Sequence, residues 1–158
     1  MPALSTAELR DVAASLAADV ALWRPHVHAD PSRRTFHALR RDPDVTVWLI
    51  CWMPGHDTGF HDHDGAAGAV AVVQGSVVEE RLRLDGSRPV EYGPGQTLGF
   101  GPADIHRVAH ATGAPAVTIH AYSPALRRMG AYVRSPDGVL LRHALDEDVE
   151  LRAEPVPA

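Results

Sequence analysis

Residues 55–63 read GHDTGFHDH, and no other stretch of the chain carries as much chemical information. It holds two histidines one residue apart, His61 and His63, between glycine turns. In a β-strand, residues i and i+2 project from the same face. His61 and His63 therefore point the same way, with Asp62 turned to the other side. Because imidazole nitrogen is a common metal ligand, the pair predicts half of a metal site.

A third histidine, His106, follows in the stretch ADIHRV (residues 103–108), directly after a glycine-rich turn. An isolated His-x-His pair is more often an exposed pair than a pair of ligands, but the glycine turns and the third histidine favour a site. Three neutral nitrogen ligands from two strands can converge inside a barrel and leave coordination positions open, as a catalytic metal requires. We therefore predict that His61, His63 and His106 bind one divalent metal ion.

Bulk properties exclude several classes of function. The chain has 158 residues, a length that predicts a single domain over residues 1–158. The formal net charge of −5 at pH 7 and the lack of a basic block predict no nucleic-acid binding. No stretch approaches the roughly 20 apolar residues of a membrane span, so we expect no membrane partner. The one cysteine, Cys51, excludes an intrachain disulfide and a cysteine-rich zinc site, which predicts a cytoplasmic protein.

The N-terminal part predicts one helix, over residues 4–22. Ser5 and Glu8 have the spacing of a capping box, and apolar residues recur on one face after them. Residues 24–32 contain two prolines and predict a loop. Residues 35–41 fit a helical turn or a short strand equally well.

From residue 45 onward the pattern predicts short β-strands separated by Gly/Pro turns. The expected strands cover residues 45–52, 58–63, 69–74, 77–84, 97–100, 106–110, 116–123, 129–133 and 139–143. About eight to ten such strands predict an all-β barrel or sandwich. In the strand over 77–84 apolar and charged residues alternate, which predicts that Glu79, Glu80, Arg81 and Arg83 form a solvated face. Within the single domain we expect an N-terminal helix and loop (1–32), a barrel (33–145) and a frayed tail (146–158).

The glycine turns around both histidine stretches resemble the two motifs of the cupin superfamily. The resemblance implies a cupin-type jelly-roll barrel with an N-terminal helix and the metal inside the barrel. Cupins often carry a glutamate four or five residues after the second histidine, where this chain has Ala67 and Gly68. A three-histidine site without a carboxylate leaves Fe(II) its full charge and favours an anionic ligand such as a thiolate. A three-histidine zinc site that activates water is the competing chemistry.

Four stretches resemble the cysteine dioxygenase-type thiol dioxygenases: ICW (50–52), GFHDH (59–63), HRV (106–108) and PAVTIHAYSP (115–124). The likeness spans roughly residues 34–133, and it implies an Fe(II) cofactor with a small thiol and O₂ as reactants. In this family a Ser-x-His-x-Tyr run forms a hydrogen-bonded chain beside the iron. The matching residues here, on one face of a strand, are Thr118, His120 and Tyr122. Tyr122 would hydrogen-bond or pass protons near the iron, and His120 would orient it.

This chain departs from the family pattern at two places. Some members have a cysteine, crosslinked to the tyrosine, where this chain has Gly68, and Cys51 lies on another strand. We therefore predict no crosslink and a core position for Cys51. Cysteine-specific members bind the substrate carboxylate with an arginine, and the best-matching position here is His37. Arginines flank it at positions 33, 34, 40 and 41.

The leading hypothesis is an Fe(II)-dependent thiol dioxygenase that adds both atoms of O₂ to a small thiol and produces a sulfinic acid. His37 or a nearby arginine would contact the far end of the substrate. The thiol could differ from cysteine, and 3-mercaptopropionate, cysteamine and ergothioneine are all plausible. One alternative is a non-catalytic cupin that binds a metal or a small ligand, and another is a three-histidine cupin with hydrolytic or isomerase chemistry. The sequence leaves the oligomeric state open.

Overall fold

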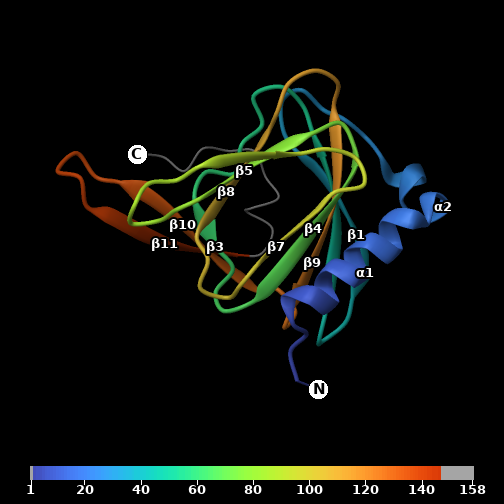
Figure 1. Ribbon diagram of the computed structural model, residues 1–158, viewed down its shortest axis with the longest axis horizontal. Helices are drawn as coiled ribbons and strands as arrows, with labels where there is room; N and C mark the ends of the chain where they lie inside the picture. The colour runs from blue at the N-terminus through green and yellow to red at the C-terminus, as the bar shows by residue number, and fades with distance from the viewer. Residues whose placement is uncertain (1, 147–158) are drawn as a thin grey trace.

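Two antiparallel β-sheets pack face to face as a barrel, and a helix lies against the outside of one of them (Figure 1). The computed structural model describes residues 2–146. Within these residues the first sheet has the strand order β1-β2-β9-β4-β7, and the second has the order β11-β10-β3-β8-β5-β6. The predicted all-β barrel with an N-terminal helix is confirmed.

The elements have the following bounds along the chain. The helices are α1 (Thr6–Ala18), α2 (Val20–Trp23) and a 3-10 turn, η1 (Arg24–His26). The strands are β1 (Thr35–Arg41), β2 (Thr46–Trp52), β3 (His61–Asp62), β4 (Ala67–Gln74), β5 (Val77–Arg81), β6 (Pro89–Tyr92), β7 (Thr97–Phe100), β8 (His106–His110), β9 (Ala116–Ser123), β10 (Arg128–Arg134) and β11 (Leu140–Asp146).

Three segments add to or differ from the sequence prediction. The segment left open between a helical turn and a strand is strand β1, paired with β2. Strand β6 was not predicted, because it is short and begins with a proline. The strand expected over 58–63 contracts to the two residues of β3. Gly59 has a φ of +67°, a left-handed conformation that glycine adopts readily, and it lies between β3 and an isolated bridge that joins Asp57 to Ala109 of β8.

The predicted capping box begins helix α1. The Ser5 hydroxyl accepts a hydrogen bond from the Glu8 backbone N–H at 3.3 Å, and the Glu8 carboxylate accepts one from the Ser5 backbone N–H at 2.8 Å. The single helix expected over 4–22 is instead broken at Asp19, whose φ of −86° and ψ of 81° are not helical. The Asp19 side chain caps α2 by accepting a hydrogen bond from the Leu22 N–H. The buried face of α1, including Leu9, lies against the first sheet.

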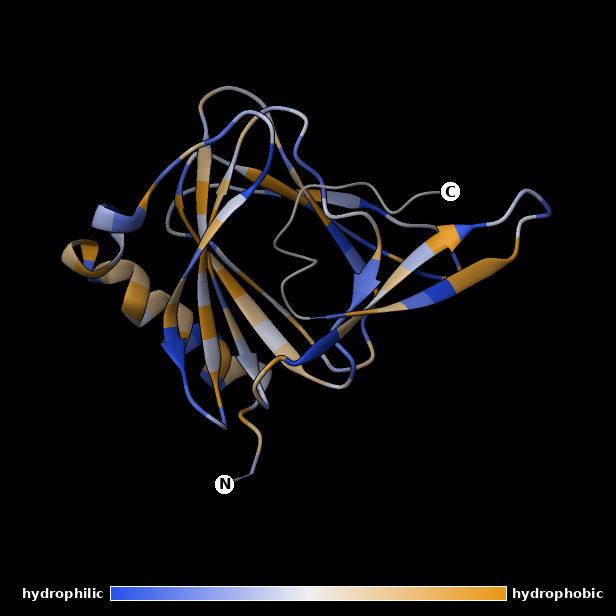
Figure 2. Cartoon of the chain, turned by 180° about the vertical axis from the view of Figure 1, so that it is seen from behind, coloured by the Kyte–Doolittle hydropathy of each residue, from blue (hydrophilic) through white to orange (hydrophobic). Residues whose placement is uncertain are grey.

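Strand β2 is buried along its whole length because both of its faces are covered. Trp48 and Trp52 point into the barrel and belong to an apolar cluster that we call the inner cluster. Leu49 and Cys51 point to the other side and belong to the outer cluster, which lies between the first sheet and α1. A strand covered on both faces requires a nearly continuous apolar run. Figure 2 shows orange, apolar bands along the strands beside the helix. Cys51 is therefore a buried core residue, as predicted.

Strands β10 and β11 extend from the second sheet as a hairpin (Figure 1). Among residues 2–146, no helix has the length and apolar character needed to cross a membrane. The tail predicted for the C-terminus lies outside the described residues, except for Asp146, which ends β11.

Candidate metal centre

Three buried histidines meet on the second sheet inside the barrel. His61 on β3 is the register partner of His106 on β8, so the sheet itself brings these two together. His63 follows β3 directly, and its ring centroid lies 4.9 Å from that of His61 and 5.1 Å from that of His106. One nitrogen of each histidine lies within 4.8 Å of the others. The three predicted ligands thus form a group that could hold a metal ion.

Hydrogen bonds to Nδ1 orient two of the three rings. The Nδ1–H of His61 donates to the Gly59 carbonyl at 3.0 Å, and the Nδ1–H of His106 donates to the Glu79 carboxylate at 2.8 Å. A carbonyl oxygen can only accept, so this His61 bond assigns the proton to Nδ1 and leaves Nε2 as the ligand atom. Metal-binding histidines are commonly oriented in this way. The residues therefore fit a metal that takes neutral nitrogen ligands.

Glu79 is a member of the centre that the sequence prediction missed. The predicted solvated face is wrong at this position, because the Glu79 side chain is only 3% exposed and bonds to His106. Val77, two residues earlier, lies in the inner cluster, and the two-residue alternation carries Glu79 to the same side. Burial raises the pKa of the Glu79 carboxyl, and the neighbouring Arg81 guanidinium opposes that shift.

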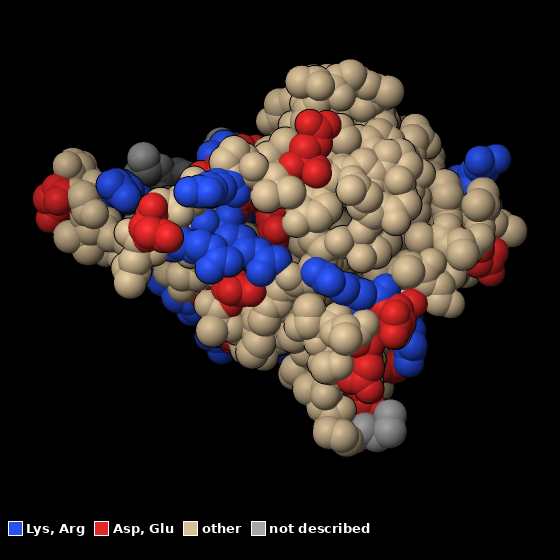
Figure 3. All heavy atoms as spheres, in the orientation of Figure 1, with Lys and Arg blue, Asp and Glu red and all other residues tan. Residues whose placement is uncertain are grey.

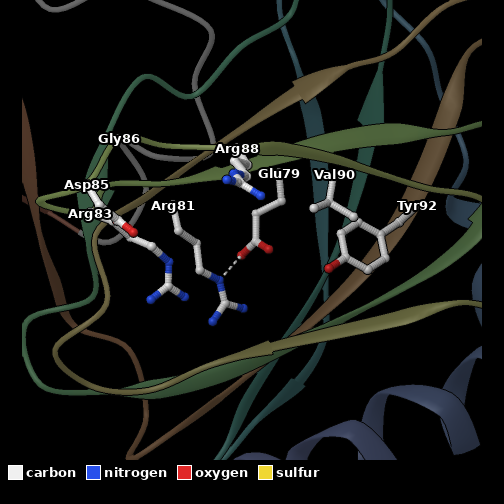
Figure 4. A pocket seen from close by; sticks show the side chains of 8 residues that line it. All are labelled: Glu79, Arg81, Arg83, Asp85, Gly86, Arg88, Val90 and Tyr92. Atoms are coloured by element: carbon white, nitrogen blue, oxygen red, sulfur yellow. Dashed lines mark hydrogen bonds and ion pairs between the residues drawn. The ribbon is translucent and has the colours of Figure 1, made fainter.

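Glu79 also lines a cavity of about 420 Å³. Its lining consists of Glu79, Arg81, Arg83, Asp85, Gly86, Arg88, Val90 and Tyr92 (Figure 4). Arg81 Nε lies 3.1 Å from Glu79 Oε1, and Arg81 also bonds to Asp104 and to the Gly99 carbonyl. Figure 3 shows basic side chains, with acidic ones among them, gathered on this part of the surface. The same Glu79 oxygen, Oε1, thus accepts hydrogen bonds from both His106 and Arg81, at the edge of a cavity lined by three arginines.

The predicted hydrogen-bonded chain lies along β9, on the face that points into the barrel. Thr118 Oγ1 lies 2.8 Å from His120 Nε2, and His120 Nδ1 lies 3.2 Å from the Tyr122 hydroxyl oxygen. All three side chains are buried. The Tyr122 ring centroid lies 5.2 Å from that of His63. The structure therefore brings the trio from the first sheet to the histidines of the second.

Trp52 extends this chain at its far end. Its indole Nε1–H donates to Thr118 Oγ1 at 2.8 Å, and both side chains are fully buried. The sequence indicated only that Trp52 belongs to the core. The alternation that places Trp52 inside is visible in the sequence, but the residue that it faces on β9 is fixed by strand pairing.

Gly68, where the sequence resemblance implies a crosslinking cysteine in some members, lies against an aromatic ring. A Cβ atom on Gly68 would lie 2.2 Å from Phe100 Cζ and 3.1 Å from Tyr122 Cδ1. The Phe100 ring in turn stacks on His63, with the centroids 4.4 Å apart. Cys51, in the outer cluster, lies on the opposite side of the sheet from Tyr122, in the inner cluster. This separation leaves no thiol to join to the phenol among the described residues.

The structure does not bring His37 to the three histidines. Its register partner is Leu49, which faces the outer cluster, and its exposed ring stacks on His26 with the centroids 3.7 Å apart. Burial, followed by the charge of His26, lowers the pKa of His37. As a substrate-binding residue His37 would have to act from the outside of the sheet.

Among the arginines that flank His37, Arg34 is the buried one, with 3% of its surface exposed. Its guanidinium carbon lies 5.1 Å from the centre of the Trp52 ring. Arg34 directly precedes β1, and its contact with Trp52, a member of the inner cluster, places its guanidinium on the interior side of the first sheet. The structure thus places an arginine inside the barrel close to the residue that the sequence singled out.

Asp62, between two of the predicted ligands, faces away from them. Its carboxylate accepts hydrogen bonds from Arg142 Nε at 2.7 Å and Arg142 Nη2 at 2.8 Å, and from the Tyr132 hydroxyl at 2.6 Å. The Arg142 bond holds the pKa of Asp62 far below its usual value, against the opposing effect of burial. Asp62 therefore ties β3 to the hairpin β10–β11.

Comparison with known proteins gives a family and a fold. Residues 3–135 match the family model for cysteine dioxygenase type I. No curated protein matches the chain.

Solved structures with the same fold include three that differ widely in sequence. The TT1209 protein of Thermus thermophilus superposes with a TM-score of 0.58 at 17% identity, covering 65% of this chain and 93% of that one. A cupin superfamily protein of Desulfitobacterium hafniense gives 0.56 at 15% identity, covering 65% and 87%. The Schizosaccharomyces pombe Cnp3 cupin domain gives 0.54 at 8%, covering 63% and 65%. At these identities the likeness shows the cupin fold alone.

Proposed function

This chain belongs to the cysteine dioxygenase type I family, and we propose that it is an Fe(II)-dependent thiol dioxygenase. It would add both oxygen atoms of O₂ to the sulfur of a small thiolate and form a sulfinate. Such a reaction is balanced without another reductant, because the electrons lost by the sulfur are those gained by the O₂.

The observation that carries this proposal is the meeting of two groups from different sheets. His61, His63 and His106 converge within 4.8 Å, and the Tyr122 ring lies 5.2 Å from the ring of His63. A site that only stores a metal has no need of a phenol and an imidazole in a buried hydrogen-bonded chain beside it. A metal centre with a proton donor or acceptor at its edge can run a reaction in which charge develops on oxygen.

Each residue has a definite part in this proposal. His61, His63 and His106 would hold Fe(II), which when bound supplies the redox chemistry that joins O₂ to a thiolate. Tyr122 would hydrogen-bond to the reacting oxygen or exchange a proton with it, and His120 would hold the phenol in place. The surrounding inner cluster, with Phe100 against His63, would exclude water from the reacting atoms.

Arg34 is the better candidate than His37 for the far end of the substrate. Arg34 is buried against Trp52 on the interior side of the first sheet, whereas His37 is exposed on the other side. A guanidinium binds a carboxylate and repels an ammonium group. We therefore propose a thiol that carries a carboxylate, such as 3-mercaptopropionate or ergothioneine, and we place cysteamine last among the candidates.

Oxygen consumption tests the reaction. The iron-loaded protein should take up O₂ with at least one thiol of a panel containing cysteine, 3-mercaptopropionate, cysteamine and ergothioneine, and mass spectrometry should detect the sulfinate. Uptake that no thiol stimulates in an iron-replete sample would refute the proposal and favour a non-catalytic cupin. His106→Ala should lose iron, whereas Tyr122→Phe should retain iron and turn over more slowly.

A pair of variants tests the substrate assignment. Arg34→Gln should raise the KM for carboxylate-bearing thiols by roughly ten- to a hundredfold, the loss expected for one charge-assisted contact. His37→Gln is the matched control on the same segment and should leave the KM unchanged. The reverse pattern would assign the contact to His37.

A further inference from the structure

A continuous hydrogen-bonded chain crosses the barrel interior from Trp52 to Tyr122. It runs from Trp52 Nε1 to Thr118 Oγ1 at 2.8 Å, from Thr118 Oγ1 to His120 Nε2 at 2.8 Å, and from His120 Nδ1 to the Tyr122 oxygen at 3.2 Å. Each member is at most 2% exposed. Bulk water therefore does not compete for these bonds, so the protein itself sets the direction of each bond.

Trp52 is the one member with a fixed polarity. An indole N–H can only donate, whereas a hydroxyl and an imidazole can each donate or accept. At Trp52 the Thr118 oxygen therefore accepts, and the indole hydrogen repels the hydroxyl hydrogen from that side. The Thr118 proton is then directed to the other partner, His120 Nε2. Accepting one bond also polarises the hydroxyl and strengthens the bond that it donates.

The opposite direction of the hydrogen bonds, with His120 donating to Thr118, leaves one hydrogen without an acceptor. If His120 carried its proton on Nε2, Thr118 would face two N–H donors, from Trp52 and from His120. Its own hydroxyl proton would then have no acceptor side chain among residues 2–146. A buried polar hydrogen without an acceptor is unfavourable, so this direction is disfavoured.

We propose that Trp52 is a positioning residue that sets the direction of the whole chain. With Thr118 donating to Nε2, His120 carries its proton on Nδ1 and donates it to the Tyr122 oxygen. The proton of Tyr122 then points away from His120, and the phenol serves as a hydrogen-bond donor toward the centre of three histidines. The catalytic use of that donor rests on the proposed dioxygenase function, but the direction of the chain does not.

Trp48 provides a matched control for Trp52. Both tryptophans lie on β2, face the inner cluster and are at most 2% exposed. The Trp48 Nε1 makes no hydrogen bond within the described part of the chain. Replacing either one by phenylalanine removes the same volume from the same strand face, but only Trp52→Phe removes a donor to Thr118.

The tautomer of His120 is the direct test. Long-range ¹H–¹⁵N spectra of the Zn(II)-loaded protein distinguish a protonated ring nitrogen from an unprotonated one, and His120→Gln identifies the resonances. In the wild type we expect His120 to be protonated on Nδ1. The Nε2–H form should be below about a tenth of the population, because the net free energy of one hydrogen bond favours the Nδ1–H form. Trp52→Phe should raise the Nε2–H form several-fold, and Trp48→Phe should leave it unchanged.

Two further variants separate the direction of the chain from changes in packing. Thr118→Val removes the hydroxyl and should also raise the Nε2–H form, whereas Thr118→Ser should keep the wild-type tautomer. An Nε2–H tautomer in the wild type would overturn the proposed direction. Equal populations of the His120 Nε2–H tautomer in Trp52→Phe and Trp48→Phe would show that Trp52 does not set the direction of the chain.

Steady-state kinetics test separately whether the His120 tautomer affects turnover. In the iron-loaded protein, Trp52→Phe should lower kcat, and it should add little to the kcat loss of Tyr122→Phe in the double variant. Full additivity of the two variants would contradict action through Tyr122. Failure of the dioxygenase function would appear as absent thiol-dependent O₂ uptake in the wild type, with the tautomer result unaffected.

Discussion

At the residue scale, the candidate centre depends on side chains that touch the histidines rather than on the histidines alone. Glu79 holds His106 through Nδ1, and Arg81 holds Glu79 in turn. Phe100 packs on His63 and occupies the space beside Gly68. Each contact limits how far a ring can rotate, and a metal requires three rings to present nitrogen at once.

Glu79→Gln should weaken metal binding without loss of the fold. The amide keeps the shape of the side chain but loses the negative charge that accepts from His106 and pairs with Arg81. We expect iron affinity to fall by about 10- to 100-fold, the usual effect of changing a partner of a ligating histidine. Competition with a chromophoric chelator measures it. Glu80→Gln, one residue along, is the control, and equal affinities for the two variants would contradict the role of Glu79.

Gly68→Ala should disturb the centre through Phe100. The added methyl group would lie 2.2 Å from Phe100 Cζ, so the ring must move, and overpacking of this kind destabilises by roughly 1–3 kcal/mol. Denaturant unfolding measures the loss, and iron affinity should fall with it. At Gly93 an added Cβ would meet its nearest neighbour at 3.8 Å, so Gly93→Ala is a control with little effect. Adding Phe100→Leu to Gly68→Ala should restore part of the stability.

At the element scale, the smallest strand carries the centre. Strand β3 has two residues that face opposite ways, since His61 lies against the other histidines while Asp62 bonds to the hairpin. So short a strand gains little from backbone pairing, because it makes few ladder bonds. The bonds from Arg142 and Tyr132 to Asp62 therefore fix β3 from its outer side.

Asp62→Asn should loosen β3 and remove part of the acid sensitivity of the fold. Because the pKa of Asp62 is lowered in the folded protein, its stabilisation is fully present above the ordinary value of 3.8 and is lost as the pH falls below that value. We expect a loss of roughly 1–2 kcal/mol at pH 7, with allowance for the partly exposed Arg142.

Urea unfolding between pH 7 and pH 3 checks this prediction. The difference between wild type and variant should shrink as the pH falls through about 4, where the unfolded-state carboxylate begins to protonate. Asp64→Asn is the control, because Asp64 also bonds to Arg142 but is 41% exposed. A difference that stays constant over the whole pH range would show that the ion pair does not stabilise β3.

At the scale of the whole molecule, the first sheet separates two interiors of different character. The outer cluster between the sheet and α1 is apolar, with Leu9 and Ala13 of the helix against Ala69 and Ile119 of the sheet. The barrel interior contains the inner cluster together with the buried histidines and the chain from Trp52 to Tyr122. Apolar burial under α1 can stabilise the fold without constraining the chemistry inside the barrel.

Leu9→Ala should therefore lower stability and leave the centre intact. Leu9 is fully buried in the outer cluster, and removing its side chain leaves a cavity that costs about 2–4 kcal/mol. Denaturant unfolding should show that loss, and iron affinity below the unfolding transition should equal that of the wild type. Leu82→Ala, at a side chain that is 36% exposed, should change stability by less than about 0.5 kcal/mol. Loss of iron before unfolding would show that α1 also supports the centre.

The sequence by itself determined the features that follow from the two-residue alternation of a strand. The shared direction of His61 and His63, and that of Thr118, His120 and Tyr122, depends only on residues within one segment. The capping box of Ser5 and Glu8 is equally local. Such local rules also predicted the all-β class, because they indicate a series of short strands separated by Gly/Pro turns, although they missed β6 and made β3 too long.

Only the tertiary structure decided which face of each strand lies inside. Alternation alone could not tell that Glu79 faces His106 or that Arg34, rather than His37, enters the barrel. These facts depend on register with strands far away in the sequence and on α1, which covers one side of the first sheet. The physical reason is that burial is a property of the closed barrel, since a single strand has two equivalent faces until distant segments pack against them.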